Sequence, residues 1–130
     1  MPLRIPSGWA VVFNKFVELP PPAEVTPEDR DAYLSQDILS MMKTAYSGEG
    51  WRTQANSLII DLGWYVPAGS DGFYRLCVLR GSWDDVLITV EDADQYVVRD
   101  RIDLILERLS NGVPIDDVVA EVTRLSDGQS

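Results

Sequence analysis

A chain of 130 residues with 45% hydrophobic and 25% charged residues has the size and composition of one globular domain rather than of a disordered segment. Its 21 acidic and 11 basic residues give a net charge of −10, which disfavours binding to nucleic acid and to anionic lipid. The chain has no histidine and a single cysteine, Cys77, which excludes Ser-His and Cys-His nucleophile pairs, a typical zinc site and an internal disulfide.

The start of the chain, MPLRIPSGWAVVF, lacks the charged-then-apolar layout of a signal peptide, and no apolar run approaches the roughly 20 residues of a transmembrane helix. Cys77 lies among Leu76, Val78 and Leu79, which indicates a small buried hydrophobe rather than a reactive thiol. We therefore expect a cytoplasmic protein with a single domain over residues 1–130, in which segments 1–7 and 126–130 fray.

Residues 9–19, WAVVFNKFVEL, are rich in β-branched and aromatic side chains and predict a first strand, which three consecutive prolines end at residues 20–22. Thr26 then suits a helix cap, and Pro27 suits the first helical position. Apolar residues recur at helical spacing after this start, so we expect a helical face that comprises Leu34, Ile38, Met41, Met42 and Ala45. The polar run 35-SQD-37 can divide this helix into two pieces.

Three strands are expected next. Residues 58–65, LIIDLGWY, alternate with a period of two, and residues 67–72 supply the proline and glycines of a turn. Residues 73–80 are apolar on both faces, as in a central strand, and Gly81-Ser82 turns the chain again. The inward face of the third strand comprises Val86, Ile88 and Val90. Turns this short join antiparallel neighbours, so the sequence predicts a β-meander.

The period changes to that of a helix from Asp92, which is a candidate cap, and Gly112 ends this helix. Its apolar face comprises Val98, Ile102, Ile105 and Leu109. Pro114 starts a last helix, whose apolar stripe comprises Ile115, Val118, Val119, Val122 and Leu125. The expected fold class is therefore α+β, with an antiparallel β-meander sheet and helices packed on one face.

Little in the chain is suited to catalysis. The stretch 69-GSDG-72 lacks the spacing and the lysine of a phosphate-binding loop and is better explained as a hairpin turn. Asp92 and Asp94 are spaced like the start of a calcium loop, but the later ligand and the glycine of such a loop are missing. Asp84 and Asp85 would point to opposite faces of a strand. We expect no enzyme activity, no cofactor and no metal, and acid–base catalysis stays an alternative only if two carboxylates share a pocket.

Acidic and aromatic residues instead indicate a surface that binds another protein. Asp61 and Tyr65 point away from the inward face of their strand, and Arg75 on the next strand lies beside them. Residues 83–98 contain five acids and no lysine or arginine, and Trp83 lies in a turn at their start. The candidate partner-binding residues are Asp61, Tyr65, Arg75, Trp83, Asp84, Asp85, Glu91, Asp92 and Asp94.

Each part of this surface has a structural alternative. Arg75 can pair with Asp61 simply to stabilise the sheet. Asp92 and Asp94 suit the N-terminus of the following helix through its dipole, which accounts for about half of the acidic cluster. Tryptophan is enriched at binding hot spots, and Trp51 and Trp83 follow or lie in turns, where either could be exposed, although a lone loop tryptophan is more often partly buried against its own domain.

Several stretches resemble a group of small bacterial proteins. That group has a GW-hydrophobic-N-x-F strand, an IDLGWYP strand, a DG-aromatic-x-L strand, a tryptophan and a C-terminal amphipathic helix. The matching stretches here are 8-GWAVVFNKF-16, 60-IDLGWYVP-67, 71-DGFYRL-76, Trp83 and residues 92–109. Val66 is inserted before Pro67, and the helix from Pro114 is extra. Proteins of this kind resemble immunity proteins, which neutralise the toxin domains of bacterial competition systems.

The resemblance implies a non-catalytic protein that binds and neutralises a cognate toxin domain. Many toxin domains are basic nucleases, and an acidic partner binds such a domain rapidly through electrostatic steering and then holds it by burying aromatic side chains. An inhibitor of this kind needs no catalytic group of its own, in keeping with the absence of histidine. The alternative function is that of a non-catalytic adaptor or chaperone-like subunit, which would use the sheet face or the last helix for its partner.

Overall fold

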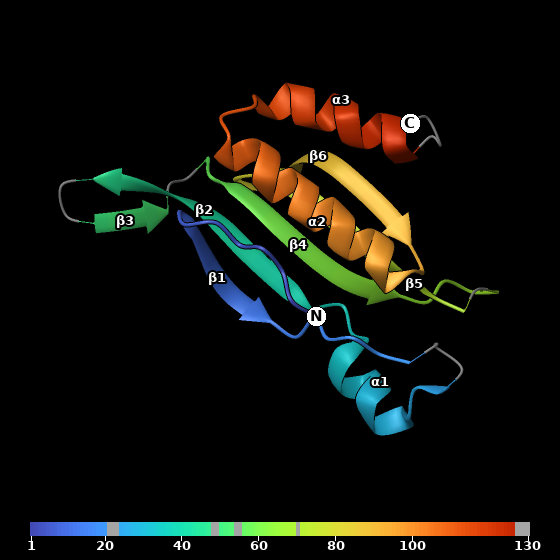
Figure 1. The fold of residues 1–130 in the computed structure, drawn as a ribbon. Helices are drawn as coiled ribbons and strands as arrows, with labels where there is room; N and C mark the ends of the chain where they lie inside the picture. Colours follow the sequence, from blue (N-terminus) through green and yellow to red (C-terminus); the bar gives the residue numbers. More distant parts are fainter. Residues whose placement is uncertain (21–23, 48–49, 54–55, 70, 127–130) are drawn as a thin grey trace.

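A computed structural model of the chain describes residues 1–20, 24–47, 50–53, 56–69 and 71–126. The strands within these ranges are β1 Trp9–Asn14, β2 Leu39–Ser47, β3 Gly50–Thr53, β4 Leu58–Tyr65, β5 Phe73–Arg80 and β6 Ser82–Asp92, and the helices are α1 Pro27–Tyr33, α2 Gln95–Ser110 and α3 Ile115–Ser126. The strands form one antiparallel sheet in the order β1-β2-β4-β5-β6, with β3 paired to β2 beside this path. Helices α2 and α3 lie across one face of it (Figure 1), so the expected α+β class is confirmed.

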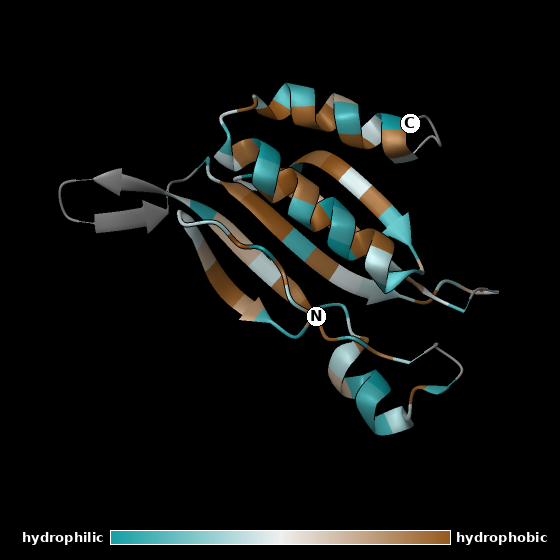
Figure 2. Ribbon diagram, in the orientation of Figure 1, coloured by the Kyte–Doolittle hydropathy of each residue, from teal (hydrophilic) through white to brown (hydrophobic). Residues whose placement is uncertain are grey.

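The core lies between the sheet and helix α2. Ile60, Val78 and Ile88 are cross-strand neighbours on β4, β5 and β6, and all three are buried. The side chains that the two long helices bury against this face are Val98, Ile102, Ile105 and Leu106 of α2 and Val118 and Val122 of α3. Figure 2 shows both helices banded in teal and brown, because each has one polar and one apolar side. Strands β4, β5 and β6 pair antiparallel in chain order, so the predicted meander is correct.

The long helix expected after Thr26 is wrong in its second half. Helix α1 does begin at this cap, whose Oγ1 accepts a hydrogen bond from the Asp29 amide, but the helix ends at Tyr33. The chain then enters β2, where Leu39 and Met41 are fully buried and alternate with less buried residues. A helix here would leave β1 and β4 without the strand that both of them pair with, so tertiary context overrides the helix preference of leucine, methionine and lysine.

The loop between α1 and β2 is fastened to β4. The Trp64 amide donates to the Ser35 carbonyl at 2.7 Å, and the Ile38 amide donates to the Leu62 carbonyl at 2.9 Å. Between these two bonds, the backbone of Gln36 crosses β4 at Gly63. A Cβ atom on Gly63 would lie 2.4 Å from the carbonyl oxygen of Gln36. Only glycine fits at this crossing, which places the loop across the strand that contains Asp61.

The first strand is shorter than the sequence predicts. β1 has a register shift between Val11 and Phe13 and ends at Asn14, whose Oδ1 accepts a hydrogen bond from the Phe16 amide at 2.9 Å. Phe16 is consequently turned into the core, where its ring meets that of Tyr74 edge to face with centroids 5.6 Å apart. A side-chain bond to the backbone two residues on is a turn device that competes with a strand ladder, and here it prevails over the strand propensity of the segment.

The last strand is longer than the sequence predicts. β6 begins at Ser82, so Trp83, Asp84 and Asp85 lie in the strand and not in a turn. Its pairing with β5 shifts register on either side of Leu79, which lies opposite Val86. The shift breaks the expected alternation: Ile88 and Val90 are buried as predicted, whereas 44% of Val86 is exposed.

The two chain ends and the helix caps differ in detail from expectation. Helix α2 is capped by Asp94 rather than Asp92, and α3 runs through Ser126, while residues 127–130 lie outside the described ranges. The segment 1–7, expected to fray, packs beside α2. Its backbone is held there by a hydrogen bond from the Arg4 amide to Asp103 Oδ1 at 2.9 Å, and its apolar side chains that contact the core are Met1, Leu3 and Ile5.

Among the described residues, no helix combines the length and the apolar character that crossing a membrane demands.

Candidate interaction surface

The structure separates the nine predicted partner-binding residues into three groups. Asp61, Tyr65, Arg75 and Glu91 lie on β4, β5 and β6, at positions that alternate with the residues buried under α2. Trp83, Asp84 and Asp85 lie at the start of β6, and Asp92 and Asp94 lie where that strand leads into α2. Asp85 and Glu91 are six residues apart on one strand, about 20 Å, so the predicted surface is not one continuous patch.

Arg75 is the centre of the first group. Its guanidinium lies over the ring of Tyr65, 4.5 Å from the centroid, and 5.7 Å from that of Phe73, the cross-strand partner of Tyr65. It forms an ion pair of 2.8 Å with Glu91 on the neighbouring strand, and 38% and 45% of the two side chains are exposed. The sequence suggested Asp61 as the partner of Arg75, and the structure gives Glu91 instead. We call Asp61, Tyr65, Phe73, Arg75 and Glu91 the open-face cluster.

No helix of the described part of the chain covers this cluster, because α2 and α3 both lie on the other side of the sheet (Figure 1). Asp61 is half-buried on this face beside Cys77, its partner on β5. Burial, and then the nearby carboxylate of Asp37, raise the pKa of Asp61 above its ordinary value of 3.8. Burial likewise raises the pKa of the Cys77 thiol, although a hydrogen bond with Thr89 opposes it. Cys77 is thus a buried, protonated thiol, as its apolar neighbours predicted.

The second group is exposed on an edge strand. Trp83 is 57% exposed, and Asp85 forms a long ion pair of 3.9 Å with Arg80. A structural role accounts for these acids: charged side chains on an edge strand prevent another strand from pairing with it. The large exposed ring of Trp83 has no such explanation. The side chain of Trp51, the other tryptophan expected to be exposed, lies outside the described part of the structure.

The two residues of the third group, Asp92 and Asp94, cap the start of helix α2. Asp94 Oδ1 accepts from the Tyr96 amide at 2.8 Å, and Asp92 Oδ1 accepts from the Asp94 amide at 2.8 Å. Their carboxylates satisfy backbone donors at the start of α2, which is the structural alternative that the sequence already offered. Asp92 and Asp94 therefore add charge to this end of the molecule without adding free binding groups.

Two features of the surface were missed from the sequence. Phe73 joins Tyr65 under Arg75 because the β4–β5 register sets them opposite each other, and only the register identifies this pair. A pocket between β4, β5 and α2 is lined by residues from six separate segments, so no single stretch of sequence predicts it. Within the described residues, no group of three or more His, Cys, Asp or Glu side chains is arranged to hold a metal ion.

Comparison of the chain with protein-family models, with curated proteins and with solved structures finds no match in any of the three.

Proposed function

We propose that this chain acts by binding another protein through the open-face cluster, and that its partner is a basic toxin domain, which it neutralises as an immunity protein does. The observation that carries the proposal is Arg75, an arginine stacked on two aromatic rings and paired with a carboxylate on a sheet face without a helix over it. Arginine and tyrosine are the residue types that, with tryptophan, dominate the energetics of protein interfaces.

The geometry around Arg75 favours binding because it is organised in advance. Tyr65 holds the guanidinium from one side, and Glu91 fixes the direction of its donors, so little side-chain entropy is left to lose when a partner covers it. Asp61 adds a carboxylate that is half-buried and has no ion pair among those formed by the described residues. A lysine or arginine of a basic partner would restore the charge balance of this carboxylate.

Survival in the presence of the toxin tests the function. The chain is co-expressed with a toxin domain encoded next to its own gene, and colony counts are compared with those of cells that contain the toxin alone. Protection is expected with the wild-type chain. Unchanged lethality, with both proteins present at comparable levels, would exclude neutralisation for that pair. Binding without protection would favour the adaptor or chaperone-like function instead.

A matched pair of variants tests the surface. Arg75→Ala is expected to weaken binding of the partner about 30-fold, because truncation of a central hot spot typically costs 2 kcal/mol or more. Arg99→Ala is the control: Arg99 also lies over a tyrosine, Tyr96, at 5.4 Å and pairs with Asp100 at 2.9 Å, but it belongs to α2. Its loss should change binding less than about twofold. Equal effects of the two variants would move the binding site away from the open face.

A further inference from the structure

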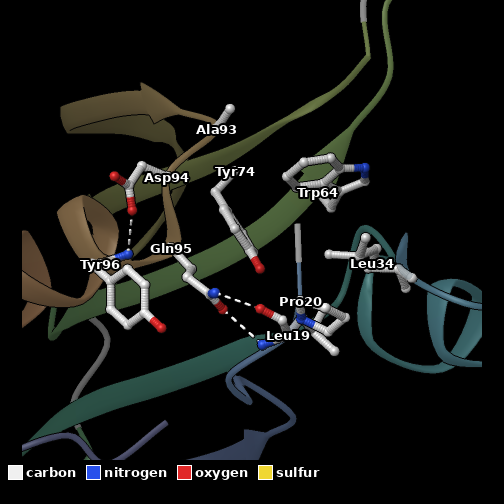
Figure 3. A pocket seen from close by; sticks show the side chains of 10 residues that line it. Leu19, Pro20, Leu34, Trp64, Tyr74, Ala93, Asp94, Gln95 and Tyr96 are labelled. Atoms are coloured by element: carbon white, nitrogen blue, oxygen red, sulfur yellow. Dashed lines mark hydrogen bonds between the residues drawn. The ribbon is translucent and has the colours of Figure 1, made fainter. Parts of the chain in front are cut away.

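A pocket of about 360 Å³ opens where β4 and β5 meet the start of α2 (Figure 3). Its aromatic floor is formed by Trp64 and Tyr74, cross-strand partners whose rings meet edge to face with centroids 4.9 Å apart. Leu19, Pro20 and Leu34 supply apolar walls from segments far away in the sequence. The pocket lies on the helix side of the sheet, so it is separate from the open-face cluster.

Most polar groups at the pocket are already used by the protein itself. The side-chain amide of Gln95 donates to the Leu19 carbonyl at 2.7 Å and accepts from the Leu19 amide at 2.9 Å, which fastens the wall to the helix. Asp94 accepts from the Tyr96 amide, as its role in capping requires. Neither side chain therefore offers its main hydrogen-bonding group to a ligand.

The hydroxyl of Tyr74 is different. Figure 3 shows it pointing into the pocket, and in the described part of the chain no hydrogen bond reaches it. Only 3% of Tyr74 is exposed, and burial raises its pKa to about 12, so the hydroxyl keeps its proton and can donate it. The Nε1 of Trp64 is also buried without a partner, but it lies on the Gly72 side of the indole ring, away from the Tyr74 hydroxyl (Figure 3), so a ligand in the pocket does not meet it. The Tyr74 hydroxyl is therefore the donor that this pocket presents to an acceptor from outside the chain.

The surroundings select the charge and size of that ligand. Asp94 at the rim repels anions, as does the overall charge of −10, and the apolar walls make any full charge costly to bury. A cavity of roughly 150 Å³ holds benzene, and ligand pockets begin at about 300 Å³, so one ring or two fused rings fit. The faces and edges of Trp64 and Tyr74 suit an aromatic guest.

We propose that this pocket binds a neutral aromatic molecule of one or two rings with one hydrogen-bond acceptor, and that the Tyr74 hydroxyl donates to this acceptor. Binding needs no partner protein and does not depend on the function proposed above.

Titration with benzyl alcohol, monitored through the indole N–H signals of the four tryptophans by NMR, tests the site. A saturable shift at millimolar concentration is expected for Trp64, with none for Trp83, which is 57% exposed and distant from the pocket. Toluene lacks the acceptor and should bind at least about threefold more weakly. Benzylamine and benzoate have the same ring with a charge, and they should bind about tenfold more weakly than benzyl alcohol. No saturable shift with any probe, or tighter binding of a charged one, would overturn the proposal.

Two variants locate the site. Tyr74→Phe keeps the ring and removes the hydroxyl, so the preference for benzyl alcohol over toluene should disappear; a preference that persists would remove Tyr74 as the recognising group. Ala93→Phe places a ring at an exposed rim position and should abolish the Trp64 shift. Ala120→Phe, at an exposed position of α3, is the matched control and should bind as the wild type does. If both phenylalanine variants retain binding, with near-ultraviolet circular dichroism like that of the wild type, the pocket is not the binding site.

Discussion

Gly72 meets two constraints at once. Its φ of +102° lies in the region that disfavours side chains, and a Cβ atom there would lie 2.6 Å from the Cζ2 atom of Trp64. Trp64 is buried in the core and cannot swing away. Gly72→Ala is therefore expected to lower the free energy of unfolding by about 3 kcal/mol, from backbone strain and overpacking together. Urea denaturation followed by circular dichroism measures this change.

The control for this substitution is a second glycine of the same turn. Gly69 has a φ of +79°, but apart from Gly69 itself and its two chain neighbours, no atom of the described residues lies within 4 Å of a Cβ placed on it. Gly69→Ala should cost only the backbone term, about 1 kcal/mol. An equal loss of stability in the two variants would mean that the contact between Gly72 and the ring of Trp64 contributes nothing.

Asp61 makes stability depend on pH. Because burial and Asp37 raise its pKa in the folded state, the folded chain binds this proton more tightly than the unfolded chain does. The carboxylate therefore destabilises the fold once the pH exceeds the raised pKa, and the cost vanishes as the pH falls below 3.8. Asp61→Asn should raise the free energy of unfolding at neutral pH by a fraction of a kcal/mol and leave it unchanged below pH 3.8. Urea denaturation at the two pH values measures this difference.

Asp37→Asn provides the comparison for that experiment. It removes only the smaller of the two causes, so it should reproduce part of the gain at neutral pH, and the double variant should gain less than the two single gains combined. A less stable Asp61→Asn variant at neutral pH would contradict the argument, since it would mean that the charged carboxylate is favoured in the folded state.

Helices α1 and α2 begin with comparable caps but differ in what they bury. Thr26 caps α1, which has no buried residue, and Asp94 caps α2, which buries four. Either cap replaced by alanine should cost about 1 kcal/mol of helix stability. We expect Asp94→Ala to lower the global free energy of unfolding by that amount, whereas Thr26→Ala should accelerate hydrogen exchange only within residues 27–33. A global loss of the same size from Thr26→Ala would show that α1 is coupled to the core.

Helices α1 and α3 show where sequence reasoning succeeds. The start of α1 was predicted because a cap and Pro27 act locally, and the stripe of α3 was predicted because a single apolar face decides its packing. Strand β2 was mistaken for helix because Ile38, Met41 and Met42 recur at helical spacing, whereas the buried pair Leu39 and Met41 follows the period of a strand. The choice between the two was made by β1 and β4, which are distant in sequence.

In the candidate site, too, the features set by local sequence were predicted, and those set by contacts between strands were not. Period two along β4 correctly separated Asp61 and Tyr65 from the buried residues, and it put Arg75 on the same face. The ion pair of Arg75 went to Glu91 rather than Asp61 because the β5–β6 register sets Arg75 opposite Glu91. The register is a property of the assembled sheet, and so is the pocket beside α2. Neither could be derived from a single stretch of the chain.

The net charge of −10 acts at the scale of the whole molecule. It surrounds the chain with a negative potential that raises the rate of encounter with a basic protein and that salt screens. Association with such a partner should slow about tenfold or more between low and high salt, while dissociation changes little. Stopped-flow measurement of both rates over a range of sodium chloride concentrations tests this, and an association rate independent of salt would exclude steering.

Two charge reversals distinguish a directed field from a diffuse one. Replacing Asp84 and Asp85 by lysine raises the net charge from −10 to −6, and replacing Asp116 and Asp117 does the same at the start of α3. If the open face is where the partner docks, the pair on β6 is nearer to the approaching charge, and its reversal should reduce the association rate several times more than reversal of the α3 pair. Because both variants have the same net charge, equal reductions would assign steering to the molecule as a whole, and a larger effect at α3 would place the docking face on the helix side of the sheet.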